Sequence, residues 1–141
     1  MSNDRDATPG PDALVTAATA ARENAHAPYS RFAVGAAVLT DDGRVFTGCN
    51  VENVSYGLTV CAERVAVFSA VAAGAKRIAA IAVVTGSRGS ACGACRQVLA
   101  EFADPDMPLH IASPDGERRD RLLGDLLPES FTPDDLARGQ D

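Results

Sequence analysis

The sequence predicts an α/β fold in which helices cover both faces of one mixed sheet. Segments with helical spacing alternate with extended apolar runs along the chain, which is the pattern of strands connected by helices. An Asp-Gly pair between the first two extended runs adds an antiparallel hairpin to this order. The length of 141 residues suits a single hydrophobic core. We therefore expect one three-layer α/β/α domain.

The first element is expected to be a helix over residues 12–27. Asp12 can cap its N-terminus, and Pro28 favours its end there because proline cannot continue a helix. This helix has one apolar face that can pack against the sheet. The apolar residues with helical spacing are Leu14, Val15, Ala18, Ala21 and Ala25.

Four extended segments are predicted to form strands. Residues 33–39 and 45–51 are apolar and flank the turn Asp41-Asp42-Gly43, so they should pair as a hairpin. Residues 78–84 form a continuous apolar run, which suits a central strand that is covered on both faces. A further strand is expected at 109–112.

Two helices are predicted between and after these strands. Residues 60–73 can form a helix that Thr59 caps and Gly74 closes, and residues 92–103 can form the next one. A short final element is expected at 122–127. The inward-facing candidates of the first of these helices are Val67, Phe68 and Val71.

Charge and hydropathy exclude several classes of partner. The net charge of -6 argues against a nucleic-acid partner, because Lys and Arg supply most of the affinity for phosphates. No apolar run is long enough to cross a membrane, and residues 1–11 lack the apolar centre of a signal peptide. We expect a cytoplasmic protein without nucleic-acid or membrane partners, whose clustered cysteines are reduced and available to a metal.

Three cysteines lie where loops are predicted to enter helices. Cys61 precedes one helix, and Cys92 and Cys95 begin the next. Helix N-termini carry a partial positive charge that favours thiolate, the form that binds zinc. Three protein ligands leave a fourth zinc position open for water, whereas a structural site is usually closed by a fourth side chain. We expect the open kind, because the remaining ligand types belong to no local motif: Cys49, His26 and His110.

Glu63 and Arg64 directly follow the first thiol. Glu63 lies two residues after Cys61, so its carboxylate can approach a water on the metal and move protons without binding the metal. Arg64 can donate to a ligand sulfur and offset the negative charge of three thiolates. The alternatives are a first-turn Glu that complements the helix dipole and a solvated surface Arg.

The motifs Cys61-Ala62-Glu63-Arg64 and Cys92-Gly93-Ala94-Cys95-Arg96-Gln97 resemble the signature of the small, homotetrameric, zinc-dependent cytidine deaminases. The resemblance extends over about residues 27–131. It implies a cytidine deaminase-like fold with a mixed five-stranded sheet over residues 12–131, between a flexible segment at 1–11 and a tail at 132–141. It also implies one Zn²⁺ per chain and a homotetramer with active sites at the subunit interfaces.

The activity implied by this resemblance is hydrolytic deamination of cytidine and 2′-deoxycytidine, with release of ammonia, in pyrimidine salvage. A hydroxide activated by zinc would attack the base, and Glu63 would shuttle the protons. Asn50 and Glu52 would hydrogen-bond the ribose hydroxyls, and Phe32 would pack near the pyrimidine.

Four further residues have roles that only the resemblance supplies. The backbone of Ala62 and the carbonyl of Ser90 would contact the base edge and its amine. Phe131 would reach into a neighbouring subunit's site and stack on the base, and Tyr56 would lie near the subunit interface. Core packing is the alternative for Phe131, and local packing for Tyr56.

One position departs from the family's pattern, and three other functions stay open. Ala91 stands where the family usually has proline, which leaves the backbone before Cys92 freer. A deaminase of blasticidin S type would share the zinc and Glu63. A thiol oxidoreductase built on Cys92 and Cys95, or a zinc-held interaction module without activity, would leave Glu63 unexplained.

Overall fold

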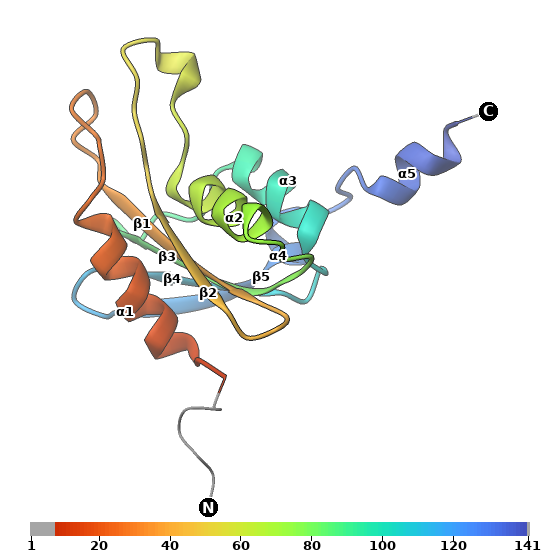
Figure 1. Ribbon diagram of the computed structural model, residues 1–141, viewed down its shortest axis with the longest axis horizontal. Coiled ribbons are helices and arrows are strands. Elements are labelled where there is room, and N and C mark those ends of the chain that lie inside the picture. Colours follow the sequence, from red (N-terminus) through yellow and green to blue (C-terminus); the bar gives the residue numbers. More distant parts are fainter. Residues whose placement is uncertain (1–7, 141) are drawn as a thin grey trace, which may run out of the picture.

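The computed structural model, which describes residues 8–140, contains one mixed sheet of five strands (Figure 1). The strands are β1 (Val34–Thr40), β2 (Val45–Cys49), β3 (Ile78–Thr85), β4 (Pro108–Ala112) and β5 (Arg118–Leu122). Their order across the sheet is β2-β1-β3-β4-β5. Only the neighbours β3 and β4 are parallel, and the other neighbouring pairs are antiparallel. The predicted mixed sheet of five strands is confirmed.

Helices cover both faces of this sheet. Helix α1 (Pro11–Arg22) lies on one face, and α2 (Ala62–Ala72) and α3 (Gly93–Phe102) lie on the other (Figure 1). The predicted three-layer α/β/α architecture is therefore confirmed. Helix α5 projects away from the rest of the chain (Figure 1). The shorter helices are η2 (Tyr56–Leu58), α4 (Leu123–Leu126) and α5 (Pro133–Arg138).

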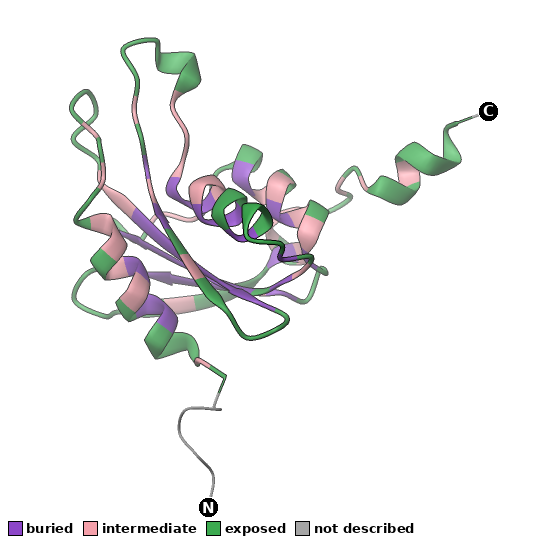
Figure 2. Cartoon of the chain, viewed as in Figure 1, coloured by how far each residue is buried: buried purple, intermediate pink, exposed green. Residues whose placement is uncertain are grey.

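Alternate residues of the central strands face the two helical layers. In β1, Ala36 and Val38 pack in the core on the side of α2 and α3, whereas Ala37 and Leu39 pack on the side of α1. Residues of β3 alternate in the same way, which explains why this strand is apolar along its length. Figure 2 shows buried residues concentrated in the sheet and on the helix faces that meet it.

Helix α1 ends at Arg22, earlier than the predicted end at residue 27. The chain turns there to pair with the segment that follows β2. The His26 N–H donates to the Asn50 carbonyl at 3.0 Å, and the Glu52 N–H donates to the His26 carbonyl at 2.8 Å. This pairing replaces further helical hydrogen bonds. Asp12 lies inside the helix, so its predicted role as the cap is also wrong.

Helix α2 begins later than predicted, and its N-cap residue is Cys61, not Thr59. Val60 forms an antiparallel bridge with Val51, through N···O distances of 3.0 and 2.9 Å. This bridge keeps the backbone extended as far as Cys61. The predicted stop at Gly74 agrees with its φ of 94°, which favours glycine.

Further predictions need correction. Phe68 and Val71 are exposed, so of the three inward candidates on α2 only Val67 is buried. The element expected at 122–127 is α4, and β5 precedes it where no strand was predicted.

The structure describes parts of both chain ends, which were expected to be a flexible segment (1–11) and a tail (132–141). The expected tail contains the short helix α5. Of the segment expected to be flexible, residues 1–7 lie outside the described residues, and Pro11 already belongs to α1. Among residues 8–140, no helix combines the length and apolarity that a membrane crossing requires.

Candidate active site

The three predicted thiols come together at the N-termini of α2 and α3. Cys61 is the N-cap of α2, Cys92 is the N-cap of α3, and Cys95 lies in the first turn of α3. Their sulfur atoms all lie within 4.8 Å of one another. Within residues 8–140, this is the only group of three or more metal-ligating side chains that close together. The described residues therefore supply three convergent thiols and no fourth ligand.

Arg64 lies beside this group, as the sequence predicted. Its Nη2 donates to the Cys61 sulfur at 3.4 Å. The neighbouring Cys95 thiol is the main cause that lowers the pKa of Cys61 to about 5, and Arg64 contributes. The pKa of Cys95 is raised, because its proton is held by Cys61 and its surroundings are buried. Cys61 is thus prepared to be a thiolate, which is the form that binds a metal.

Glu63 lies on the wall of a pocket next to the thiols. Its side chain is 4% exposed, although it belongs to the first turn of α2. Burial raises the pKa of this carboxyl to about 7, because the charged form loses its hydration. A buried carboxyl with a pKa near neutrality can both accept and release a proton, which suits acid–base catalysis.

The pocket has a volume of about 440 Å³. This size falls within the range of small-molecule sites. Five of the predicted site residues, besides the thiols Cys61 and Cys92, line it: Phe32, Asn50, Glu52, Glu63 and Ser90. Residues from β1, β3, the two helix N-termini and the loops between them thus meet at one end of the sheet.

Asn50 and Glu52 each make several hydrogen bonds, to backbone groups and, for Glu52, also to the Ser30 hydroxyl. The Asn50 amide donates to the Phe32 carbonyl at 2.7 Å and accepts from the Val34 N–H at 2.9 Å. One oxygen of Glu52 accepts from the N–H groups of residues 29 and 30, and the other accepts from the Ser30 hydroxyl. The Ser30 hydrogen bond lowers the pKa of Glu52 below its usual value. Both side chains are therefore ordered before any ligand arrives.

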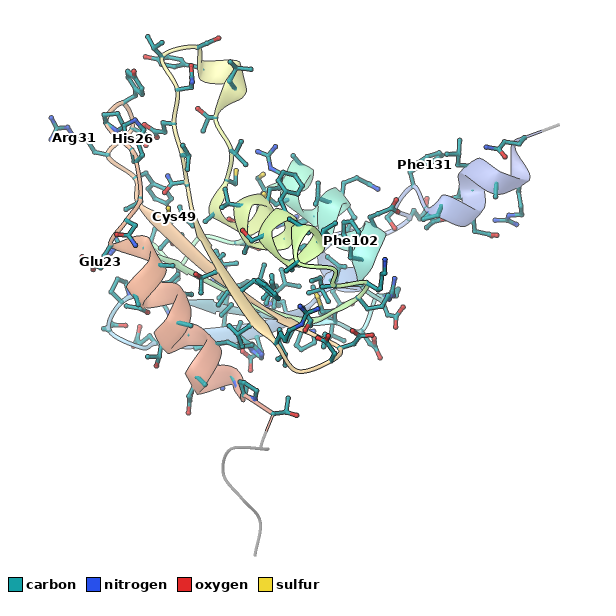
Figure 3. The ribbon with its side chains drawn as sticks, viewed as in Figure 1. Glu23, His26, Arg31, Cys49, Phe102 and Phe131 are labelled. Carbon is teal, nitrogen blue, oxygen red and sulfur yellow. The ribbon has the colours of Figure 1, made fainter. Side chains whose placement is uncertain are left out.

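Besides Cys95 and Arg64, three predicted site residues lie outside the pocket lining. Ala62 is buried at the start of α2. Tyr56 is 73% exposed and contacts Tyr29, with ring centroids 5.6 Å apart. Phe131 is 62% exposed and lies on the segment that leads to α5, away from the sheet (Figure 3).

Several pocket residues were not predicted. The Ser30 hydroxyl donates to the Glu52 carboxylate. Thr59, which lies between Glu52 and Cys61 in the sequence, also lines the pocket. Thr85 accepts from the Gly89 N–H at 2.7 Å and so shapes the loop before Cys92. Single hydroxyl-bearing or small apolar residues have no spacing that marks a site in the sequence. Their place in the pocket follows from the fold. The unpredicted lining residues are Ser30, Val34, Thr59, Val83, Thr85 and Gly89.

The donor set fits zinc, which prefers sulfur and nitrogen ligands in a tetrahedral arrangement. Three thiols converge, and the described residues leave the fourth position without a protein ligand. An acid of raised pKa, Glu63, lines the same pocket as Cys61 and Cys92. Open zinc sites of this kind are catalytic, and a carboxyl group that can move protons beside such a site suits hydrolysis. The fold and the site place the chain in the class of zinc-dependent hydrolases.

Comparison with known proteins identifies the family. The family described as "Cytidine and deoxycytidylate deaminase zinc-binding region" matches residues 11–111. This match covers most of the chain and both thiol motifs. The chain belongs to the cytidine deaminase family, and it is a zinc-dependent hydrolytic deaminase.

Individual relatives agree with this assignment. The chain is 45% identical to a cytidine deaminase of Sporosarcina psychrophila, over 88% of this chain and 93% of that protein. It is 54% identical to a cytidine deaminase of Mycobacterium tuberculosis, over 86% and 89%. The crystal structure of a cytidine deaminase from Burkholderia pseudomallei, 55% identical, superposes with a TM-score of 0.80 over 84% of this chain and 97% of that one.

Proposed function

We propose that this protein converts cytidine and 2′-deoxycytidine to uridine and 2′-deoxyuridine, with release of ammonia, in pyrimidine salvage. The observation that carries the proposal is the buried Glu63 carboxyl beside three convergent thiols, on the wall of a pocket of about 440 Å³. The names of the relatives support cytidine as the substrate. We propose the cytoplasm as the location, because a reducing compartment keeps the cysteines as thiols.

Cys61, Cys92 and Cys95 would hold one zinc ion per chain. When bound, zinc lowers the pKa of a coordinated water and thereby supplies the nucleophile for hydrolysis. Arg64 would reduce the net negative charge of the three thiolates through its contact with Cys61. The helix N-termini of α2 and α3 add partial positive charge at the same place.

Glu63 would move the protons of the reaction. It takes a proton from the attacking water and gives it to the ring nitrogen next to the reacting carbon. After the oxygen has bonded to that carbon, Glu63 would transfer the second proton from this new hydroxyl to the amino group. The carbon–nitrogen bond then breaks, the carbonyl forms and ammonia leaves. Its pKa of about 7 lets the same carboxyl accept and donate near neutral pH.

The remaining pocket residues would position the nucleoside. Asn50 and Glu52 would hydrogen-bond the ribose, and Phe32 would pack against the pyrimidine; all three line the pocket. The backbone at Ala62 and the Ser90 carbonyl would contact the edge of the base and its amine. The sugar contacts favour a nucleoside over a free base.

We also propose that four chains assemble, with Phe131 completing the site of a neighbouring chain. The phenyl ring is 62% exposed and lies outside its own chain's pocket lining. A stacked aromatic ring from a second chain would cover the base. Tyr56, which is 73% exposed, would lie near the same interface.

One experiment tests metal and reaction together. The protein is purified, zinc per chain is measured, and conversion of cytidine to uridine is followed by absorbance. We expect one zinc per chain and turnover, and we expect Glu63→Gln to keep its zinc while kcat falls about 100- to 10,000-fold. A Glu63→Gln variant with full activity would refute the proposed role of this residue.

The same assay distinguishes the alternatives. Blasticidin S as the better substrate would indicate the related nucleoside deaminase. A thiol oxidoreductase would act without metal and fail as Cys92→Ser, even with Glu63 intact. A structural zinc module would bind zinc, show no turnover, and be insensitive to Glu63→Gln.

A further inference from the structure

The Arg96 guanidinium connects two segments that are far apart in the sequence. Arg96 lies in the first turn of α3, directly after Cys95. Its Nη1 donates to the Leu126 carbonyl at 3.0 Å, and its Nη2 donates to the Ser90 hydroxyl at 3.2 Å. A planar guanidinium can hold two acceptors in fixed directions at once, which a lysine ammonium cannot. One side chain therefore fixes both segments against the helix that carries two of the thiols.

The loop between β3 and α3 is held at each of its ends by a different side chain. At the β3 end, the Gly89 N–H donates to the Thr85 hydroxyl at 2.7 Å. At the α3 end, the Ser90 hydroxyl accepts from Arg96. Arg88 between them has a φ of 57°, a conformation that non-glycine residues seldom adopt. Contacts at both ends thus impose the shape of this loop.

The second segment held by Arg96 leads to Phe131. The Leu126 carbonyl lies at the C-terminal end of α4, where helical carbonyls lack partners in the helix. The next residue on α3, Gln97, donates to the Phe131 carbonyl at 2.8 Å. Two adjacent side chains of α3 therefore hold the two ends of the segment 126–131.

Burial of the Arg96 side chain is partly unfavourable, which is not the case for an arginine on the surface. Its Nε is buried and has no hydrogen-bond partner among residues 8–140. A buried donor without a partner is destabilising. The side chain thus makes its two Nη contacts while its third donor, Nε, stays without a partner. These two contacts join the loop beside the thiols to the C-terminal segment.

We propose that Arg96 is a positioning residue. Its two hydrogen bonds hold the Ser90 loop and the segment that carries Phe131 in the positions that catalysis requires. The inference rests on the proposed function, in which the Ser90 carbonyl receives the amine and Phe131 stacks on the base. Arg96 acts through these groups and does not touch the substrate. Because Ala91 restricts the backbone next to Ser90 less than proline would, the contact from Arg96 contributes more to fixing the position of this loop.

The kinetic test compares Arg96→Gln and Arg96→Lys with a control, Arg121→Gln. Arg121 is exposed on β5 and bonds the carbonyl of the adjacent residue. For chains loaded with zinc, we expect Arg96→Gln to lower kcat/KM for cytidine about 10- to 100-fold, because small displacements of positioning groups are costly. Arg96→Lys should fall between, and the control should be unchanged. Full activity of either Arg96 variant would overturn the proposal.

A double-mutant cycle tests whether Arg96 acts through Ser90. Ser90→Ala removes the hydroxyl acceptor but retains the backbone carbonyl. If the contact is functional, Ser90→Ala costs activity, and adding it to Arg96→Gln costs much less than it does alone. Additive losses would overturn the coupling. If Arg96→Gln does not fold, Ser90→Ala alone still tests the contact, because full activity of Ser90→Ala would contradict it.

Hydrogen–deuterium exchange tests the positioning without any reference to turnover. We expect faster amide exchange at 86–91 and at 126–131 in Arg96→Gln than in Arg121→Gln, with the exchange of β3 unchanged. Unchanged exchange in both segments would overturn the proposal, even if the protein deaminates cytidine. An unaltered protein that fails to deaminate cytidine would instead contradict the proposed function, and the exchange result would still decide whether Arg96 holds the two segments.

Discussion

Ala91 stands between Ser90 and Cys92, at the position where the resemblance to the family's pattern led us to expect proline. The residue is buried, and its N–H donates no hydrogen bond within residues 8–140, so a proline there would lose none. We expect Ala91→Pro to stabilise the protein by about 0.4–1 kcal/mol, because proline restricts the unfolded chain. A more rigid loop should also raise kcat for cytidine modestly. Thermal melting and steady-state kinetics measure both, and identical values for the two proteins would contradict the prediction.

The sequence predicted the main residues that meet at the candidate site but few of those that hold them in place. Cys61, Glu63 and Cys95 fall in short local motifs, and the structure brings them together at the two helix N-termini. Ser30 and Thr85 were assigned no role from the sequence, and their hydroxyls reach the site because distant segments meet there. Pairing between remote segments is a property of the fold, so single positions do not reveal it.

At Gly48, strand β2 passes very close to the backbone of α2. A Cβ built on this glycine would lie 2.5 Å from the Ala62 carbonyl and from the Ala66 nitrogen, both of which are backbone atoms of α2. We expect Gly48→Ala to push α2 away from the sheet and to lower the free energy of unfolding by about 1–3 kcal/mol. Because α2 begins at Cys61, zinc affinity should fall as well. Chemical denaturation and competition with a chelator measure the two effects.

Two other glycines serve as controls for that prediction. Gly57 has open space around its position, so Gly57→Ala should change neither stability nor zinc affinity. Gly35 approaches α1 on the opposite face, where a Cβ would lie 1.9 Å from the Ala18 carbonyl. Gly35→Ala should therefore destabilise the fold, with little direct effect on the thiols. Equal zinc affinities for Gly48→Ala and Gly57→Ala would contradict the link between β2 packing and the metal site.

At the level of elements, the sequence predicted the strands β1 to β4 and missed only the edge strand β5. The sequence of strand β5 is Arg-Arg-Asp-Arg-Leu, and the strand lies at the edge of the sheet. Charged side chains suit an edge strand because they prevent pairing with other chains. The same charges remove the apolar pattern by which a strand is recognised in a sequence. Helix α5 was also missed, although Thr132 and Asp135 form a capping box and Pro133 opens the helix. Its six residues are too few for a clear helical period.

At the level of the whole molecule, apolar side chains remain on the surface at places that the core does not explain. Phe68 and Val71 are exposed on α2, and Leu58 is exposed in η2. The periodicity of α2 predicted that the first two face inward, because an apolar stripe on a helix does not reveal which surface will cover it. The proposed assembly of four chains would bury such residues between subunits.

The proposed contact of Phe131 with a neighbouring site can be tested by mixing two inactive or weakened chains. Phe131→Ala should lower kcat/KM, because stacking on a base contributes about 1–3 kcal/mol. Glu63→Gln lacks the proton shuttle but keeps its phenyl ring. In co-expressed oligomers of the two variants, an intact Glu63 in one chain can receive Phe131 from the other. We expect the activity per Phe131→Ala chain to rise as the share of Glu63→Gln chains increases.

The result depends on which chain supplies the ring. If Phe131 packed only within its own chain, every Phe131→Ala subunit would lack the stacking contact whatever its partners were, and mixing would not restore activity. Phe131→Ala/Glu63→Gln chains, which have no ring to donate, are the matched control and should restore nothing. Sedimentation of each mixture establishes that the chains assemble, so an absence of rescue in fully assembled mixed oligomers would contradict the contact between subunits.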